Sequence, residues 1–219
     1  MKKVFEYWMP DSDNHFERLI NKRVNNGGPP QYQDDVRDEA YKYVTDFDIA
    51  IDVGANVGLW AKPLTKKFNR VIAFEPMPQV LECLEKNVQR LNVEINRFAL
   101  GNANGNVEMQ WDPVNTGNSH ITEIGTGNIE IRKLDDLDLP KFGMLKIDCE
   151  RHELQVLQGA RKTILKYKPI IICEQHPDTD YNAGEYIKDE LGAVELDNVR
   201  KDYIFGFGGW NGYYCYFNI

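Results

Sequence analysis

Small residues and acids at the ends of short apolar runs could together bind a nucleoside. The stretch Asp48–Gly58 reads DIAIDVGANVG, in which a run with β-branched residues leads into a turn with two glycines, Gly54 and Gly58. The composition of the run favours a strand buried on both faces, and a helical pattern follows the turn. Such a turn lets the backbone approach a ligand closely, and the first N–H groups of the helix point at a polar group bound there.

A second apolar run, Val71–Glu75, ends in a carboxylate. Glu75 follows Gly54 at roughly the 20-residue spacing at which an acid ending the second strand accepts hydrogen bonds from ribose hydroxyls. The glycines are spaced Gly-x-x-x-Gly, unlike the Gly-x-Gly-x-x-Gly of dinucleotide sites, and Asp52 lies two residues before the first of them. This arrangement better matches the nucleoside site of S-adenosyl-L-methionine (SAM) methyltransferases, and we predict that cofactor.

Further polar side chains lie at the ends of two other predicted strands. Asp148 ends the apolar run Met144–Asp148, and Glu174 ends Ile170–Glu174, with His176 two residues further on. In an open α/β sheet the ligand lies beyond the carboxyl ends of the strands. We predict that Asp148 holds the amino group of the donor's methionine. For the base that removes the acceptor's proton, the candidates are His176, Asp148 and Glu174.

The acids near these strand ends also allow a different chemistry. Oxygen ligands suit Mg²⁺, and four residues could contribute to such a site: Asp148, Glu150, Glu174 and His176. Their spacing matches no recognised metal motif, and we therefore predict no metal. Lys146, within the central strand, could instead supply a cationic partner for acids that are costly to bury alone.

The overall composition is that of a globular chain and sets limits on its partners. The 219 residues carry a formal net charge of −8 without a basic cluster, which disfavours a nucleic-acid substrate. No apolar stretch approaches transmembrane length, and the opening residues turn acidic before the apolar run of a signal peptide could form. The four cysteines are far apart and form no C-x-x-C pair, as expected of reduced intracellular thiols. We therefore expect a cytoplasmic protein.

Apolar runs alternate with helical patterns along the chain, which predicts a doubly wound α/β fold. We expect a mostly parallel seven-stranded sheet with an antiparallel edge hairpin over Gly206–Phe217, whose last strand is Tyr213–Phe217. The third strand is predicted over Val93–Leu100, followed by a β excursion that flanks the nucleoside site. A helix is predicted over Leu59–Phe68.

The first 46 residues are predicted to form a short helical extension, and residues 47–219 the cofactor-dependent domain. Helices are expected over His15–Val24 and Asp34–Val44. The extension could only cover an edge of the sheet, or it could also form a lid over a substrate.

Five segments of the chain together form a more specific pattern. They read IDVGANVGLW at 51–60, AFEP at 73–76, FALG at 98–101, LKIDCERHELQVLQGA at 145–160 and ICEQHP at 172–177. This pattern resembles that of FkbM-type SAM-dependent methyltransferases. The resemblance implies a class I methyltransferase fold, SAM as methyl donor, and commonly O-methylation of hydroxyls on sugars or other small metabolites. The complete predicted cofactor-binding set is Asp52, Gly54, Ala55, Asn56, Gly58, Glu75, Pro76, Ala99, Leu100 and Asp148.

One position departs from the family pattern. The family usually has glycine after Asp-x-Glu, where this chain has Arg151. Its cation could narrow the acceptor pocket, bind an acidic acceptor or point to solvent. We predict methyl transfer to a hydroxyl of a sugar, a glycan or a small metabolite. Two alternatives stay open: a SAM-binding module in which Arg151 blocks turnover, and an NAD-dependent oxidoreductase, which the missing third glycine disfavours.

Overall fold

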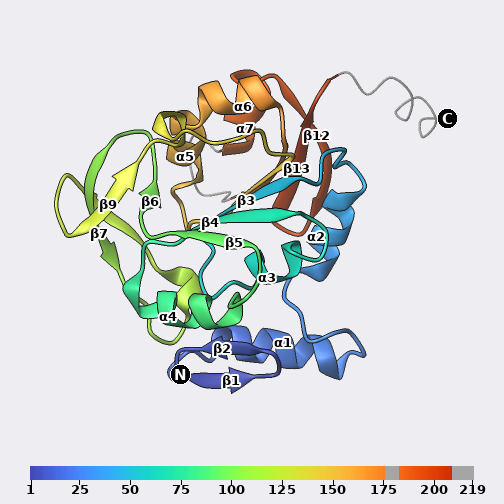
Figure 1. Ribbon diagram of the computed structural model, residues 1–219, viewed down its shortest axis with the longest axis vertical. Helices are drawn as coiled ribbons and strands as arrows, with labels where there is room; N and C mark the ends of the chain where they lie inside the picture. The colour runs from blue at the N-terminus through green and yellow to red at the C-terminus, as the bar shows by residue number, and fades with distance from the viewer. Residues whose placement is uncertain (176–182, 209–219) are drawn as a thin grey trace.

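A seven-stranded sheet forms the centre of the protein. The computed structural model describes residues 1–175 and 183–208, and Figure 1 shows their arrangement. The strand order is β12-β13-β11-β10-β3-β4-β5. The strands span Ile49–Val53 (β3), Arg70–Phe74 (β4), Val93–Asn96 (β5), Met144–Ile147 (β10), Ile170–Glu174 (β11), Ala193–Val199 (β12) and Asp202–Phe207 (β13). β13 runs antiparallel to both of its neighbours, while the other pairs are parallel. The predicted mostly parallel, doubly wound sheet with an antiparallel edge hairpin is confirmed.

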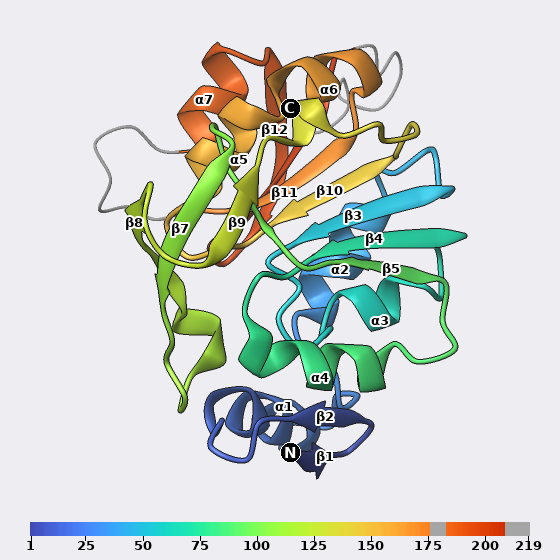
Figure 2. The same ribbon diagram turned by 60° about the vertical axis from the view of Figure 1, so that its left-hand side comes forward.

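Helices cover both faces of this sheet, which explains why its strands are apolar runs rather than alternating patterns. One face carries α2 (Asp34–Tyr41), α3 (Ala61–Leu64) and α4 (Pro78–Asn87). The other carries α5 (Glu153–Gly159), α6 (Arg161–Tyr167) and α7 (Ala183–Asp189), as Figure 2 shows. In the part of the chain that the structure describes, no helix combines the length and apolar character of a membrane span.

A smaller sheet lies beside the main one and forms the predicted β excursion. Its order is β6-β9-β7-β8, with strands at Ala99–Leu100 (β6), Gly105–Gln110 (β7), His120–Ile124 (β8) and Ile129–Arg132 (β9), and 3₁₀ turns at Thr116–Asn118 (η1) and Leu134–Asp136 (η2). The single strand predicted over Val93–Leu100 is wrong. Its first half pairs with β4, whereas Ala99 and Leu100 pair with β9, so the chain passes between the two sheets.

Two other sequence predictions need correction. The helix expected over Leu59–Phe68 is α-helical over Ala61–Leu64 alone, and it contains Pro63, which lacks the N–H that a longer helix would use. The hairpin at the sheet edge is formed by β12 and β13 and lies earlier than predicted. The predicted strand Tyr213–Phe217 lies outside the described residues.

The N-terminal segment contains a strand pair that the sequence analysis did not predict. Antiparallel strands β1 (Lys2–Val4) and β2 (Tyr7–Met9) precede α1 (His15–Asn25). Figure 2 shows this hairpin and α1 against α4. The contact is specific, because the Asn87 amide of α4 accepts a hydrogen bond from Trp8 N at 2.6 Å and donates to Trp8 O at 2.8 Å. The segment is thus bound to the sheet's helical layer by two hydrogen bonds between the Asn87 side chain and the Trp8 backbone, as well as by packing.

The turn after β3 requires a glycine at position 54. Gly54 has a φ of +75°, and a Cβ there would lie 1.9 Å from the backbone oxygen of Asp148. We expect Gly54→Ala to lower the free energy of unfolding by more than about 2 kcal/mol, because left-handed strain and a backbone collision combine. Gly27→Ala is the matched control, since Gly27 has a φ of +80° with nothing within 4 Å. Equal losses for the two variants in urea unfolding would show that the close approach to Asp148 is not what demands glycine.

Candidate active site

A pocket opens at the carboxyl ends of β3, β4 and β10, where the sequence analysis predicted a ligand. Eight of the ten predicted cofactor-binding residues line it: Gly54, Ala55, Asn56, Glu75, Pro76, Ala99, Leu100 and Asp148. The other two lie outside the lining. Asp52 is fully buried beneath the turn, and Gly58 faces α4, since a Cβ on it would lie 2.9 Å from Leu84 Cδ1. Their positions support the turn rather than contact the space in the pocket.

Glu75 is buried at the end of β4 and is held in place by two backbone groups. Its Oε2 accepts a hydrogen bond from Asn56 N at 2.7 Å, and its Oε1 accepts one from Met77 N at 2.8 Å. Burial raises the pKa of this carboxyl to about 7, although the two backbone bonds oppose that shift. Each carboxylate oxygen has a further lone pair for a ligand hydroxyl.

Lys146 lies under the glycine turn and joins β10 to β3. Its Nζ lies 3.2 Å from Asp52 Oδ1 and 3.6 Å from Asp148 Oδ2, and it donates to Gly54 O at 3.3 Å. Burial by itself would lower the pKa of Lys146, but the two acids outweigh it and raise the pKa, so the ammonium stays charged. The predicted pairing of Lys146 with strand-end acids is confirmed.

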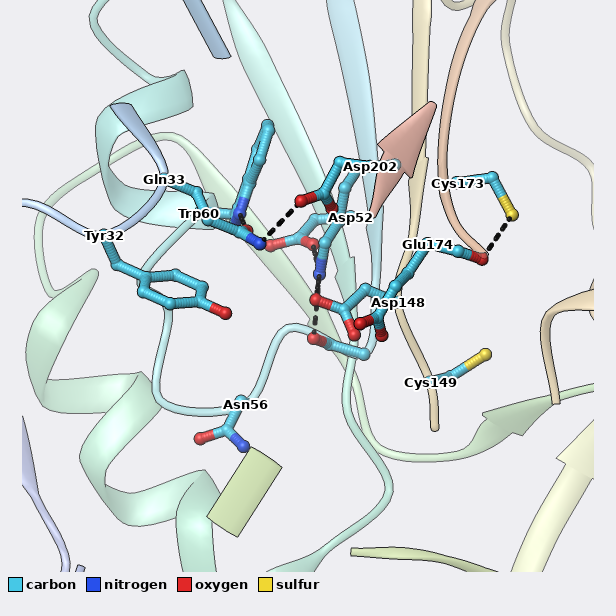
Figure 3. A network of polar contacts seen from close by, with 12 residues as sticks. Tyr32, Gln33, Asp52, Asn56, Trp60, Asp148, Cys149, Cys173, Glu174 and Asp202 are labelled. Carbon is cyan, nitrogen blue, oxygen red and sulfur yellow. Dashed lines mark hydrogen bonds and ion pairs between the residues drawn. The ribbon is translucent and has the colours of Figure 1, made fainter. Parts of the chain in front are cut away.

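A second set of contacts brings the N-terminal segment to the same place. Trp60 Nε1 donates to Gln33 Oε1 at 2.6 Å, and Gln33 Nε2 donates to Asp202 Oδ2 at 3.0 Å, as drawn in Figure 3. Phe16 and Tyr32 line the pocket itself. In Figure 3 the Tyr32 hydroxyl points toward the acids of the strand ends. The N-terminal segment is therefore part of the pocket wall.

Three carboxylates gather at the ends of β10 and β11, where Asp148 and Glu150 line the pocket and Glu174 lies beside them outside its lining. Asp148, Glu150 and Glu174 each place an oxygen within 4.8 Å of the others, and Figure 3 shows Asp148 and Glu174 side by side. Burial, and then the charges of Asp148 and Glu150, raise the pKa of Glu174 to about 8. Burial and the charge of Asp148 raise the pKa of Glu150 to about 7. Such a group of carboxylates could take up a proton from a hydroxyl or hold a cation. The expectation that the protein binds no metal remains a prediction.

A buried contact that the sequence analysis missed connects α1 to the loop between β7 and β8. The Asp13 carboxylate accepts hydrogen bonds from Phe16 N at 3.2 Å, Thr116 N at 3.1 Å and Thr116 Oγ1 at 2.6 Å. Thr116 Oγ1 also lies 3.1 Å from Asn56 Oδ1 of the glycine turn. A local pattern can predict that an acid such as Asp13 lies at the start of a helix. It cannot predict that Asp13 pairs with Thr116, which is 103 residues away.

The loop after β10 has two features that the sequence analysis did not predict. Glu150 and Arg151 both have positive φ, of 50° and 70°, which explains why glycine suits the position of Arg151. The Arg151 side chain is exposed and is not in the pocket lining, so of the three predicted possibilities it points to solvent. His152, expected only to begin the following helix, is buried and lines the pocket. His176 lies outside the described residues.

The strand order and the position of the pocket are those of the class I SAM methyltransferase fold. The chain belongs to the FkbM methyltransferase family, because residues 52–201 match the family model described as "Methyltransferase FkbM domain". This membership confirms the resemblance seen in the sequence, and with it SAM as methyl donor. It favours a methyltransferase over the NAD-dependent oxidoreductase.

The chain is similar to two curated proteins and to several solved structures. Hexuronic acid methyltransferase AglP of Haloferax volcanii is 28% identical over 169 residues, covering 74% of this chain and 70% of AglP. AMB antimetabolite synthetase AmbE of Pseudomonas aeruginosa is 24% identical, covering 77% of this chain but 10% of AmbE. The structure of methyltransferase FkbM from Methylobacillus flagellatus is 20% identical with a TM-score of 0.45, covering 74% of this chain and 43% of that one.

The raised carboxyl pKa values of Glu174 and Glu150 predict how the stability of the protein depends on pH. Glu174 and Glu150 stay protonated in the folded state at pH values where the unfolded chain has lost those protons. The free energy of unfolding is therefore expected to fall as the pH rises from about 5 to about 8. Glu174→Gln should flatten this fall, and Glu123→Gln on the exposed strand β8 should leave it unchanged. Thermal unfolding across the pH range is the measurement; parallel curves for all three proteins would contradict the assignment.

Proposed function

We propose that this protein transfers the methyl group of SAM to a hydroxyl of a sugar, a glycan or another small metabolite. The observation that carries the proposal is the set of groups gathered in one pocket and directly beside it. The glycine turn and Glu75 lie along it, and Asp148 lies next to the carboxylates that could accept a proton. Methyl transfer from a sulfonium needs alignment of nucleophile, methyl and sulfur, and removal of a proton, and these groups suit both needs.

The charge of the pocket suits the donor. SAM carries a sulfonium and an ammonium, and the carboxylates of Asp148, Glu150 and Glu75 line the pocket. In the proposed mode Glu75 accepts hydrogen bonds from the ribose hydroxyls with its remaining lone pairs. Asp148 holds the methionine ammonium, and the N–H groups of the turn at Gly54–Asn56 lie along the donor. The turn is well placed for this because Lys146 holds Gly54 from below.

Glu174 is the base that the described residues support best. Its raised pKa of about 8 makes it a stronger base than an ordinary carboxylate, and it lies close to Asp148 and Glu150, which line the pocket. A base with a pKa near the working pH combines ionisation with driving force for proton transfer. Asp148, paired with Lys146, is better suited to binding. His176 stays a second candidate from the sequence.

The acceptor is proposed as an alcohol, by two arguments. A relative is named hexuronic acid methyltransferase, which favours a sugar. The pocket offers a base next to the donor's proposed reacting end, which a hydroxyl needs. The exposed Arg151 does not occlude the pocket, and this favours a working enzyme over the degenerate SAM-binding module.

The N-terminal segment is proposed to act as a wall or lid of the donor site. Phe16 and Tyr32 contribute their rings to the pocket, and the buried bond between Asp13 and Thr116 holds α1 over the glycine turn. A donor enclosed in this way is shielded from water, which strengthens each electrostatic contact made to it.

The donor site is tested by removing one charge at a time. Asp148→Asn is expected to weaken the binding of S-adenosylhomocysteine about 10- to 100-fold, because a charge-assisted hydrogen bond to the ammonium is lost. Adenosine, which lacks the ammonium, should bind both proteins equally. Asp202→Asn is the matched control, since the Asp202 carboxyl interacts electrostatically with Asp148 but does not line the pocket. Calorimetric titration that shows equal affinity in Asp148→Asn and the parent protein would refute the proposed role.

The base is tested in the methyl-transfer reaction with a panel of sugars and sugar acids. Glu174→Gln is expected to lower kcat/KM at least about 100-fold while S-adenosylhomocysteine binds as before. In the parent protein kcat/KM should rise with pH through an apparent pKa between about 7 and about 8, and this rise should disappear in the variant. A full rate in Glu174→Gln together with a lost rate in His176→Ala would transfer the role to His176. Absence of methyl transfer to every hydroxyl acceptor, with donor bound, would support the degenerate module instead.

A further inference from the structure

One buried polar atom in the donor pocket has no partner among the described residues. His152 is 7% exposed, and its Nε2 has no hydrogen bond. The side chain lines the pocket, and a Cβ on Gly101 would lie 2.9 Å from Nε2. A buried ring nitrogen left without a partner is unfavourable, so this atom points to a ligand that would complete it.

The backbone before His152 explains how the ring comes to this place. Asp148 lies only four residues earlier, and its carboxylate lies close to those of Glu150 and Glu174. Glu150 and Arg151, both in the left-handed region, reverse the chain between them. His152 then lies at the start of α5 and against Gly101, next to the pocket-lining residues Ala99 and Leu100. The imidazole thus lines the same pocket as the carboxylates of Asp148 and Glu150.

The surroundings of His152 select the chemistry of the ligand. Burial lowers the pKa of His152 to about 4, so the ring is neutral and offers no charge to a phosphate or carboxylate. Nearby pocket walls are apolar, with Leu100 at 3% and Phe74 at 1% exposure, and Phe98 packed edge to face on Phe74 at 5.5 Å. A flat, uncharged heterocycle with polar edge atoms fits such walls and such a partner.

We infer that His152 is a specificity-determining residue, whose Nε2 hydrogen-bonds the polar edge of the donor's adenine. This rests on the proposed use of the pocket for SAM. Depending on its tautomer, a neutral imidazole accepts a hydrogen bond from the 6-amino group or donates one to a ring nitrogen. In either case the site recognises adenine by a polar atom on the edge of its ring, because a site built to pair with such an atom rejects analogues that lack it.

The test compares three ligands in calorimetric titrations: S-adenosylhomocysteine, its inosine analogue, which lacks the 6-amino group, and its 7-deaza analogue, which lacks N7. The parent protein should prefer the natural ligand over at least one analogue by about 10-fold. His152→Phe, which keeps a flat ring but no polar edge, should bind the natural ligand about 10-fold more weakly and lose the preference. His152→Gln, whose amide can reach the position of Nε2, should restore part of the preference for the natural ligand.

The ratios of the ligand affinities distinguish hydrogen bonding by His152 from a purely structural role of this residue. Loss of packing would weaken all three ligands alike and leave their affinity ratios unchanged, so equal ratios in the parent protein and His152→Phe would overturn the inference. Without ligand, His152→Phe should melt at the same temperature as the parent protein or higher, because it removes the unpaired nitrogen. If the parent protein binds none of the three ligands, the proposed donor site fails, and that result is distinct from binding without discrimination.

Discussion

The buried ammonium of Lys146 is the interaction on which the rest of the site depends. A charge in the centre of a sheet is tolerated only when it is paired and hydrogen-bonded, and Lys146 has Asp52, Asp148 and the Gly54 carbonyl around it. These partners belong to two neighbouring strands and to the turn that follows one of them. The contacts of Lys146 therefore fix the position of the glycine turn relative to the end of β10. Gly54 has no side chain because the Asp148 backbone occupies the place where its Cβ would be.

The same group leaves an excess of negative charge above it. Asp148, Glu150 and Glu174 lie close together, and one buried lysine cannot neutralise all of them. Their mutual repulsion and burial keep protons on Glu150 and Glu174 at pH values where exposed carboxylates are ionised. In the proposed mode of donor binding, a cationic donor would relieve this repulsion. Carboxyl groups whose pKa is raised by burial and repulsion are common at functional sites.

The pocket is also assembled from parts that lie far apart in the chain. The N-terminal segment supplies Phe16 and Tyr32, the smaller sheet supplies Thr116, and the loop after β10 supplies His152. Asp13 ties the first two parts together through a buried hydrogen bond. The enclosure of the pocket thus depends on contacts outside the strand-and-turn unit of β3 and Gly54–Gly58.

The sequence by itself determined the sheet, the family and most of the donor pocket. Strands such as β3 are short apolar runs because helices cover both faces, and Glu75 and Asp148 end such runs, so their place at one edge of the sheet follows from periodicity and strand direction. Tertiary structure decided what no local pattern encodes. It split the run at Val93–Leu100 between two sheets, because Ala99 and Leu100 find their pairing partners in β9. It also turned His152 into the pocket through two left-handed residues, and it brought Asp13 to Thr116. These outcomes depend on contacts between distant segments, which are chosen by packing and hydrogen bonding in three dimensions.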